Sequence, residues 1–200
     1  MLRSTALVTT TVALACSSAA FAGVSVFNSE SAFAAAAGAV GLDLLSQGFT
    51  NYSGTYSDVS GSINGVAWAA QASTTLSAAS GVLSASDNGG SITISFSGTA
   101  TTAIGGDFFS LNTSGSRISA VALITLVDGQ TFVNSIGGGQ FRGYLSDGAA
   151  IRSISLTPYT NFASRPSVER LLVGTVAVPA PGAIALLGLA GAFGSRRRRA

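Results

Sequence analysis

Eight carboxylates are the side chains of this 200-residue chain that could carry out acid–base chemistry. The chain has no His and no Lys, and its single Cys is Cys16. A Ser-His-Asp triad requires an imidazole, Schiff-base catalysis requires a Lys, and a zinc site requires Cys or His at set spacings, so none of these is expected. Two suitably placed carboxylates can hydrolyse a glycosidic bond, and the composition leaves this reaction open.

Half of these carboxylates fit structural roles. Glu30 stands where a helix is expected to begin. Three others lie in predicted turns that contain glycine, namely Asp87, Asp128 and Asp147. The remaining four show no pairing in the sequence: Asp43, Asp58, Asp107 and Glu169. The sequence therefore predicts a protein that is not an enzyme, and a carboxylate-based glycan hydrolase or lyase is the alternative.

Calcium and carbohydrate are the ligands that other polar and aromatic residues could bind. Loop carboxylates suit calcium, but no D-x-D or D-x-N-x-D loop occurs, so we expect no cofactor and keep a structural calcium ion as the alternative. Five aromatic side chains could stack on sugars: Tyr52, Tyr56, Trp68, Tyr144 and Tyr159. Tyr52 and Tyr56 share a predicted loop, whereas Trp68 is flanked by Val and Ala and is expected in the core.

Low charge and small residues characterise the body of the chain. Charged residues make up only 9% of the sequence and apolar residues 47%, with 25 Gly. Between Gly23 and Val178, five Arg stand against eight Asp and Glu, a net charge of −3. This part has no basic patch, so nucleic acid is not an expected partner.

Short strands are expected to position these side chains. The clearest is 91–97, where Ile92, Ile94 and Phe96 alternate with polar residues. Apolar runs on either side of Asp128-Gly129 predict a hairpin with a type I′ turn. About nine or ten such strands, with turn signals every 8–12 residues or so, predict an all-β fold, a jelly-roll-like β-sandwich of two sheets.

Other segments of the body are less regular. Residues 29–38 predict one short helix that Ser29 or Asn28 caps and Gly38 ends. Residues 46–62 are rich in Gly, Ser and Thr and are expected to form a loop. The Gly-Gly pair inside 103–111 indicates a bulge or a close approach of another chain segment.

The N-terminus has the pattern of a secretory signal peptide. Arg3 is followed by a short apolar run, and Ala20-Phe21-Ala22 forms a cleavage site before Gly23. Cleavage there would leave a mature chain without Cys. A lipoprotein in which Cys16 carries the lipid is the alternative.

The C-terminus combines prolines, an apolar run and arginines. Val178, Pro179, Ala180 and Pro181 precede the uncharged segment 182–194, and Arg196, Arg197, Arg198 and Arg199 follow it. As a helix the segment would span about 20 Å, against about 30 Å for the hydrocarbon core of a bilayer, so we expect a marginal transmembrane helix. The arginines would stay cytoplasmic and stop translocation. A plain C-terminal anchor is the alternative.

This order of features resembles the PEP-CTERM sorting signal, a tail also labelled an ice-binding-protein C-terminal domain. The usual motif is Val-Pro-Glu-Pro, and Ala180 takes the place of its Glu here. The resemblance implies recognition by an exosortase, which cuts near the prolines and releases or attaches the body at the outer surface. The body also loosely resembles the cargo of such tails, which is associated with exopolysaccharide and biofilm.

Together these patterns predict a signal peptide at 1–22, a β-sandwich domain at 23–177 and a sorting or anchor segment at 178–200. The expected protein is exported, passes through an inner-membrane intermediate and ends at the cell surface or outside the cell. Its expected partners are an exosortase-type enzyme, the membrane and, for a glycan-binding body, exopolysaccharide.

Overall fold

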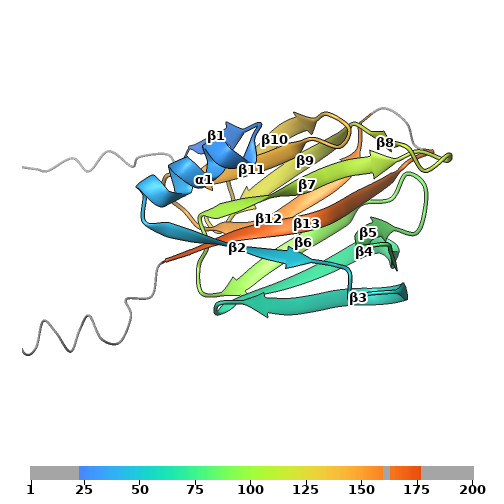
Figure 1. The fold of residues 1–200 in the computed structure, drawn as a ribbon, viewed down its shortest axis with the longest axis horizontal. Coiled ribbons are helices and arrows are strands. Elements are labelled where there is room, and N and C mark those ends of the chain that lie inside the picture. The colour runs from blue at the N-terminus through green and yellow to red at the C-terminus, as the bar shows by residue number, and fades with distance from the viewer. Residues whose placement is uncertain (1–22, 160–162, 177–200) are drawn as a thin grey trace, which may run out of the picture.

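Apolar and polar residues alternate along many strands of this chain, so successive side chains point to opposite faces of the sheet. The computed structural model describes residues 23–159 and 163–176 (Figure 1). In chain order the elements are β1 (Val24–Phe27), α1 (Glu30–Ala39), β2 (Leu42–Gly48), β3 (Gly54–Ile63), β4 (Val66–Ala79), β5 (Val82–Ala85), β6 (Ile92–Gly98), β7 (Ala103–Leu111), β8 (Arg117–Ile118), β9 (Ala120–Leu126), β10 (Thr131–Ile136), β11 (Phe141–Ser146), β12 (Ile151–Pro158) and β13 (Arg165–Val176).

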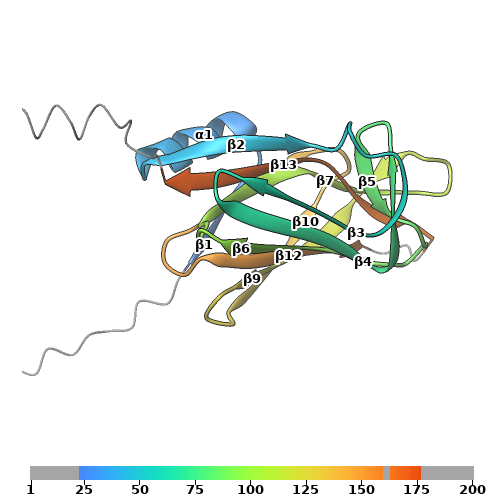
Figure 2. The ribbon, with the colours of Figure 1, turned by 90° about the horizontal axis from the view of Figure 1, so that it is seen from below.

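The strands form a β-sandwich of two layers, as the sequence predicts. One hydrogen-bonded path runs β1-β11-β7-β13-β5-β4-β6-β12-β9-β10, with β2 on β13, β3 on β4 and β8 on β7. The helix-side layer contains β1, β11, β7, β13 and β2, and the opposite layer contains β6, β12, β9 and β10 (Figure 2). Strand β4 joins the layers, because its first half pairs with β6 and its second half with β5.

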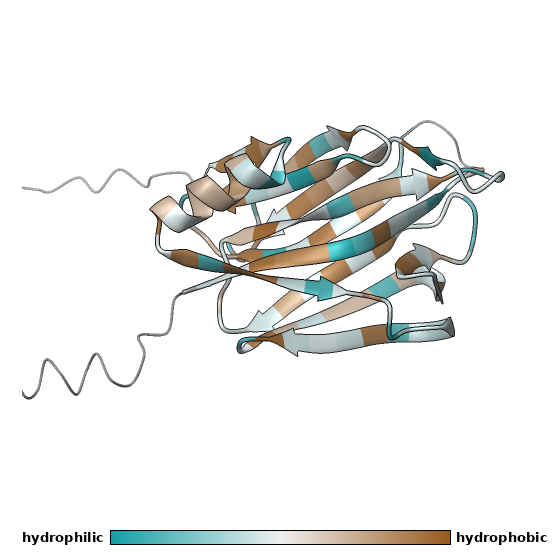
Figure 3. Cartoon of the chain, in the orientation of Figure 1, coloured by the Kyte–Doolittle hydropathy of each residue, from teal (hydrophilic) through white to brown (hydrophobic). Residues whose placement is uncertain are grey.

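The main core lies between the two layers. Trp68, Phe49, Phe108 and Tyr144 are its largest buried side chains. In β6, Ile92 and Ile94 are fully buried and Phe96 packs against the same core, so the predicted face of this strand is confirmed. Apolar and polar residues alternate along several strands, which gives the banded colouring of Figure 3.

Helix α1 covers the outer face of the helix-side layer. The Ser29 hydroxyl accepts a hydrogen bond from the backbone N–H of Ala32, so the predicted N-cap is confirmed. The helix continues one residue past Gly38, to Ala39, and the chain turns at Gly41, whose φ is +75°. Gly38 therefore does not end the helix, because the left-handed conformation that terminates it falls at Gly41.

Two paired glycines form a seat for the helix. Gly105 in β7 lies opposite Gly143 in β11, and the fully buried ring of Phe33 rests on both. A Cβ atom at Gly143 would lie 2.5 Å from Cγ of Phe33, and one at Gly106 would lie 2.2 Å from the carbonyl oxygen of Arg170. The Gly-Gly pair of β7 thus allows close approach on both sides, which confirms the prediction for 103–111.

The predicted loop at 46–62 is wrong. Strand β2 extends to Gly48, and β3 occupies most of the remaining segment. Asn64 and Gly65 have φ values of 47° and 85° and join β3 to β4 in a two-residue hairpin, with Ile63 opposite Val66. Both central residues have positive φ, as a type I′ turn requires. One face of this edge strand is exposed and carries small polar residues. Such a composition is also typical of loops, so the sequence of β3 predicts a loop.

The predicted hairpin between β9 and β10 is confirmed, but the prediction of a type I′ turn is wrong. Gly129 has a φ of +90°, and Asp128 is not among the described residues with positive φ. The N–H of Gly129 donates to the carbonyl of Leu126, and the N–H of Leu126 donates to the carbonyl of Gln130. This is a three-residue loop that ends in a left-handed glycine.

The predicted signal peptide and the predicted sorting segment lie outside the described residues. Within 23–159 and 163–176, no helix is long and apolar enough to cross a membrane. The start of β1 and the end of β13 lie at the same end of the sandwich, and β5 and β8 lie toward the other end (Figures 1 and 2).

Candidate functional site

A bulge in β13 places charged residues on the outer face of the helix-side layer. The register between β13 and β7 shifts between Val168 and Leu171, and both of these side chains are fully buried in the main core. Glu169 and Arg170 together stand opposite the single residue Asp107 of β7, so β13 has one extra residue here and both side chains point away from the core. Figure 3 shows this hydrophilic stretch in the middle of β13.

Arg170 connects the helix to the sheet. Its guanidinium donates two hydrogen bonds to the carboxylate of Glu30, at 3.0 and 2.7 Å, and one to Asp107 at 3.1 Å. The hydrogen bonds to Glu30 are the main cause that raises the pKa of Arg170 above its ordinary value, and partial burial opposes them. Glu30, predicted only to start a helix, thus also holds that helix to β13.

Arg117, in β8, lies next to Glu169 on this outer face. Its guanidinium donates a hydrogen bond to Glu169 at 2.7 Å and lies over the ring of Phe109, 4.3 Å from the ring centroid. The ion pair is about 40% exposed at each side chain, so it orients Arg117 more than it stabilises the fold.

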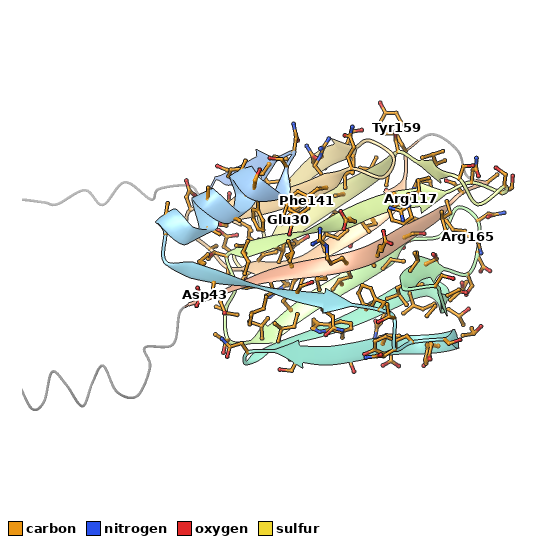
Figure 4. All side chains as sticks on the ribbon, in the orientation of Figure 1. Glu30, Asp43, Arg117, Phe141, Tyr159 and Arg165 are labelled. Carbon is orange, nitrogen blue, oxygen red and sulfur yellow. The ribbon has the colours of Figure 1, made fainter. Side chains whose placement is uncertain are left out.

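A depression beside Arg117 combines hydroxyl groups with two guanidinium groups. We call it the arginine–serine depression, and it has a volume of about 320 Å³. Its lining consists of Ser77, Ala79, Ser80, Val82, Ser84, Phe109, Leu111, Gly115, Arg117 and Arg165. No carboxylate is among these residues. Arg117 and Arg165 both lie at the end of the sandwich that is remote from Asp43 (Figure 4).

Facing strands build the floor of this depression. Ser77 in β4 lies opposite Ser84 in β5, which lies opposite Ser167 in β13, which lies opposite Phe109 in β7. Directly opposed residues share a face of the sheet, so three hydroxyls and an aromatic ring form one row. The hydroxyls of Ser84 and Ser167 are 2.8 Å apart and hydrogen-bonded.

An adjoining depression of about 390 Å³ shares Arg165 with the first one. Its other lining residues are Ser86, Asp87, Asn88 and Thr113. The hydroxyl of Ser86 is buried and has no hydrogen-bond partner among the described residues.

The structure brings two of the four candidate carboxylates to one place. Asp107 and Glu169 both line a third depression of about 370 Å³, the carboxylate depression, with Gly48, Phe49, Thr50, Gly81 and Arg170. Each carboxylate accepts a hydrogen bond from an arginine. Asp43 and Asp58 are exposed and do not line it. The sequence shows no sign of this pairing, because it depends on the register between β7 and β13.

The aromatic side chains do not form the sugar-stacking surface considered from the sequence. Trp68 and Tyr144 are buried in the core, at 2% and 1% exposure, so the expectation of a core position for Trp68 is confirmed. Tyr52 and Tyr56 meet edge to face and pack against the same core. Tyr159 is exposed and is labelled in Figure 4. Phe109, which the sequence did not single out, is the aromatic residue at the arginine–serine depression, where its ring is fully buried beneath Arg117.

Metal ligands are not gathered in the described part of the chain. Within 23–159 and 163–176, no group of three or more His, Cys, Asp or Glu side chains lies together. The calcium alternative therefore stays a prediction that no observation supports.

The fold is similar to that of solved carbohydrate-binding structures. A carbohydrate-binding module of family 29 aligns with a TM-score of 0.41 at 14% identity, over 66% of this chain and 90% of the module. A variant of such a module complexed with mannohexaose aligns with a TM-score of 0.42 at 14% identity, over 66% of this chain and 93% of that one.

A larger protein also contains a similar fold. A family two carbohydrate esterase from Cellvibrio japonicus aligns with a TM-score of 0.37 at 12% identity, over 68% of this chain and 36% of the esterase. No family model and no curated protein matches the chain. Similarity at this level describes the fold and carries no argument about the ligand.

Proposed function

We propose that this chain is an exported, non-enzymatic protein of the cell surface or extracellular matrix, and that its sandwich binds glycan in the arginine–serine depression. The lining of that depression is the observation that carries the proposal. Serine hydroxyls and guanidinium groups can pair with sugar hydroxyls, and the partly exposed Val82 and Leu111 offer apolar surface to the sugar ring. Small side chains such as Ala79 and Gly115 leave the space open.

The location of the depression suits a protein held at a surface. Arg117 and Arg165 lie at the end of the sandwich opposite to the end of β13 (Figure 4). A body attached through the segment that follows β13 would present this end outward. The resemblance of 178–200 to a PEP-CTERM signal supports such an attachment, either as an intermediate before exosortase cleavage or as a lasting anchor.

Filling the depression tests the binding function. Ala79→Trp places an indole in the depression, and we expect the full chain carrying it to lose binding on a glycan array. Ala35→Trp is the matched control, because Ala35 is exposed on α1 and lies outside the depression. Equal binding by both variants, or no binding by the parent protein to any glycan, would reject the proposal.

A carboxylate-based hydrolase or lyase is the second candidate, favoured by one observation. Asp107 and Glu169 line the same depression, as a pair of catalytic carboxylates would. If glycan turnover is found and Asp107→Asn or Glu169→Gln abolishes it while the melting temperature changes little, the protein is an enzyme. We expect no turnover.

The sorting role is tested at the C-terminus. Replacing Pro179 and Pro181 with Ala should retain membrane insertion but block cleavage, which leaves full-length protein in the membrane. Replacing Arg196–Arg199 with Ser should remove the stop, because crossing even one Arg costs at least about 2.5 kcal/mol, and should release unprocessed protein. A wild-type mature protein that keeps these arginines would instead be a plainly anchored surface protein.

A further inference from the structure

The arginine–serine depression is positively charged in a body that is acidic overall. Arg117 and Arg165 line it, and no Asp or Glu is among its lining residues. The described residues nevertheless contain five Arg against eight acidic residues. Glu169, the partner of Arg117, belongs to the lining of the carboxylate depression instead. Because Glu169 offsets the charge of Arg117, the positive charge that favours an anionic group on the ligand is that of Arg165.

Arg165 is the guanidinium that is free to bind such a group. Arg117 and Arg170 are both engaged by carboxylates. The side chain of Arg165 forms no ion pair and no hydrogen bond within 23–159 and 163–176, although it is half-buried between two depressions. A guanidinium presents five donors in a planar fork, which matches the paired oxygens of a carboxylate or sulfate.

Further donors surround Arg165. Ser86, whose buried hydroxyl lacks a partner in the described part of the chain, lines the adjoining depression together with Arg165. Thr113 lines the same depression and belongs to a turn that Asn112 holds by accepting hydrogen bonds from the backbone N–H groups of Ser114 and Ser116. The donors are thus carried by a strand end and an ordered turn.

We propose that this site takes a sugar residue with an anionic substituent, either the carboxylate of a uronic acid or a sulfate ester. Arg165 binds the anionic group through its fork, and the exposed Thr113 donates a hydrogen bond from its hydroxyl to the same residue of the glycan. The partly buried Ser77 and the exposed Ser80, which line the arginine–serine depression with Arg117, receive the neighbouring sugar. This inference rests on the proposed glycan binding and specifies the class of glycan.

Titration calorimetry of the full chain with three oligosaccharides tests the inference. The probes are a galacturonate hexamer, the same hexamer with its carboxylates methyl-esterified, and a sulfated galactan oligosaccharide. We expect the esterified hexamer to bind at least about tenfold more weakly than the acid form, because it keeps the sugar rings but lacks the charge. Tight binding of the sulfated probe alone would identify the anion as a sulfate ester.

Two substitutions with opposite expected effects on the affinity strengthen the test. Arg165→Gln should weaken binding of the acidic probe about tenfold, and Asp87→Asn should strengthen it by removing a like charge from the adjoining depression. Arg152→Gln is the control, because Arg152 is exposed on β12 and lines neither depression. Arg165 lacks an ion pair, so its loss should leave the melting temperature nearly unchanged.

The outcomes separate this inference from the function on which it rests. If acid and ester bind equally and Arg165→Gln changes nothing, the anionic specificity is wrong while glycan binding stands. If no glycan of either kind binds the parent protein, the proposed function itself fails.

Discussion

The contact between Phe33 and Gly143 supports a sharp prediction about how the helix is held on the sheet. A Cβ atom at Gly143 would lie 2.5 Å from both Cγ and Cδ2 of Phe33, closer than side chains in folded proteins approach. The added methyl group must therefore push α1 away from β11. Overpacking of this kind costs about 1–3 kcal/mol, so we expect Gly143→Ala to lower the free energy of unfolding by about 2 kcal/mol.

Removing the ring should relieve most of this cost. Phe33 is fully buried, and its ring lies 5.8 Å from those of Phe27 and Phe141, so Phe33→Ala alone should cost about 3–5 kcal/mol. In that background Gly143→Ala no longer meets the two nearest ring atoms, and the Cβ of residue 33 stays at 2.9 Å. The double mutant should therefore be more stable than additivity predicts, by at least about 1 kcal/mol.

Urea unfolding followed by the fluorescence of Trp68, the single and buried tryptophan, measures all four proteins. Gly38→Ala is the control, because a Cβ atom there meets nothing within 4 Å. This helical position should gain up to about 1 kcal/mol from the same substitution. If Gly143→Ala costs the same with and without the Phe33 ring, the ring is not the cause and the seat described here is wrong.

Three further predictions concern stability. Burial raises the pKa of Tyr144 in the folded protein. The neutral phenol therefore contributes fully to the free energy of unfolding below the pKa of a Tyr in the unfolded chain, about 10, and this contribution is lost as the pH rises above that value. Between pH 8 and 11 the urea midpoint should fall more for the wild type than for Tyr144→Phe, and parallel curves would contradict this. The backbone N–H of Gly23 donates to the carboxylate of Asp147, and signal cleavage would turn this amide into an ammonium group. Asp147→Asn should then lower the melting temperature more in protein that begins at Gly23 than in protein acetylated there, and equal losses would count against it. Gly65→Ala should lower the free energy of unfolding in urea by about 1 kcal/mol or more, because the φ of Gly65 is +85° and the Thr99 hydroxyl oxygen lies 2.9 Å from the added Cβ atom. An unchanged urea midpoint would exclude strain at this turn.

Local patterns in the sequence were sufficient for the class of fold. The alternation around Ile92 and Ile94 assigns one face of β6 to the core, and Ser29 marks the start of α1, because both signals depend only on neighbouring residues. The hairpin at Asp128 was predictable for the same reason. The composition of β3 does not distinguish it from a loop, because its exposed face is rich in Gly, Ser and Thr, which are equally common in loops. The local signal for this strand is the Asn64-Gly65 turn that follows it.

The candidate site was not predictable in this way, because long-range register creates it. Arg170 meets Glu30, 140 residues earlier in the chain, only after β13 and α1 have packed on one layer. The bulge that turns both Glu169 and Arg170 outward depends on a one-sided mismatch with β7.

By itself, the sequence determined the alternating strands, the helix cap and the absence of His and Lys, which together specify a sandwich with little catalytic chemistry. Tertiary structure alone decided that Ser77, Ser80 and Arg165 share one depression and that Arg165 is left without a partner among the described residues. The physical reason is that strand periodicity is a property of one segment. A binding face, by contrast, is a property of which strands pair and in what register, and many pairings are compatible with the same alternation of small and apolar residues.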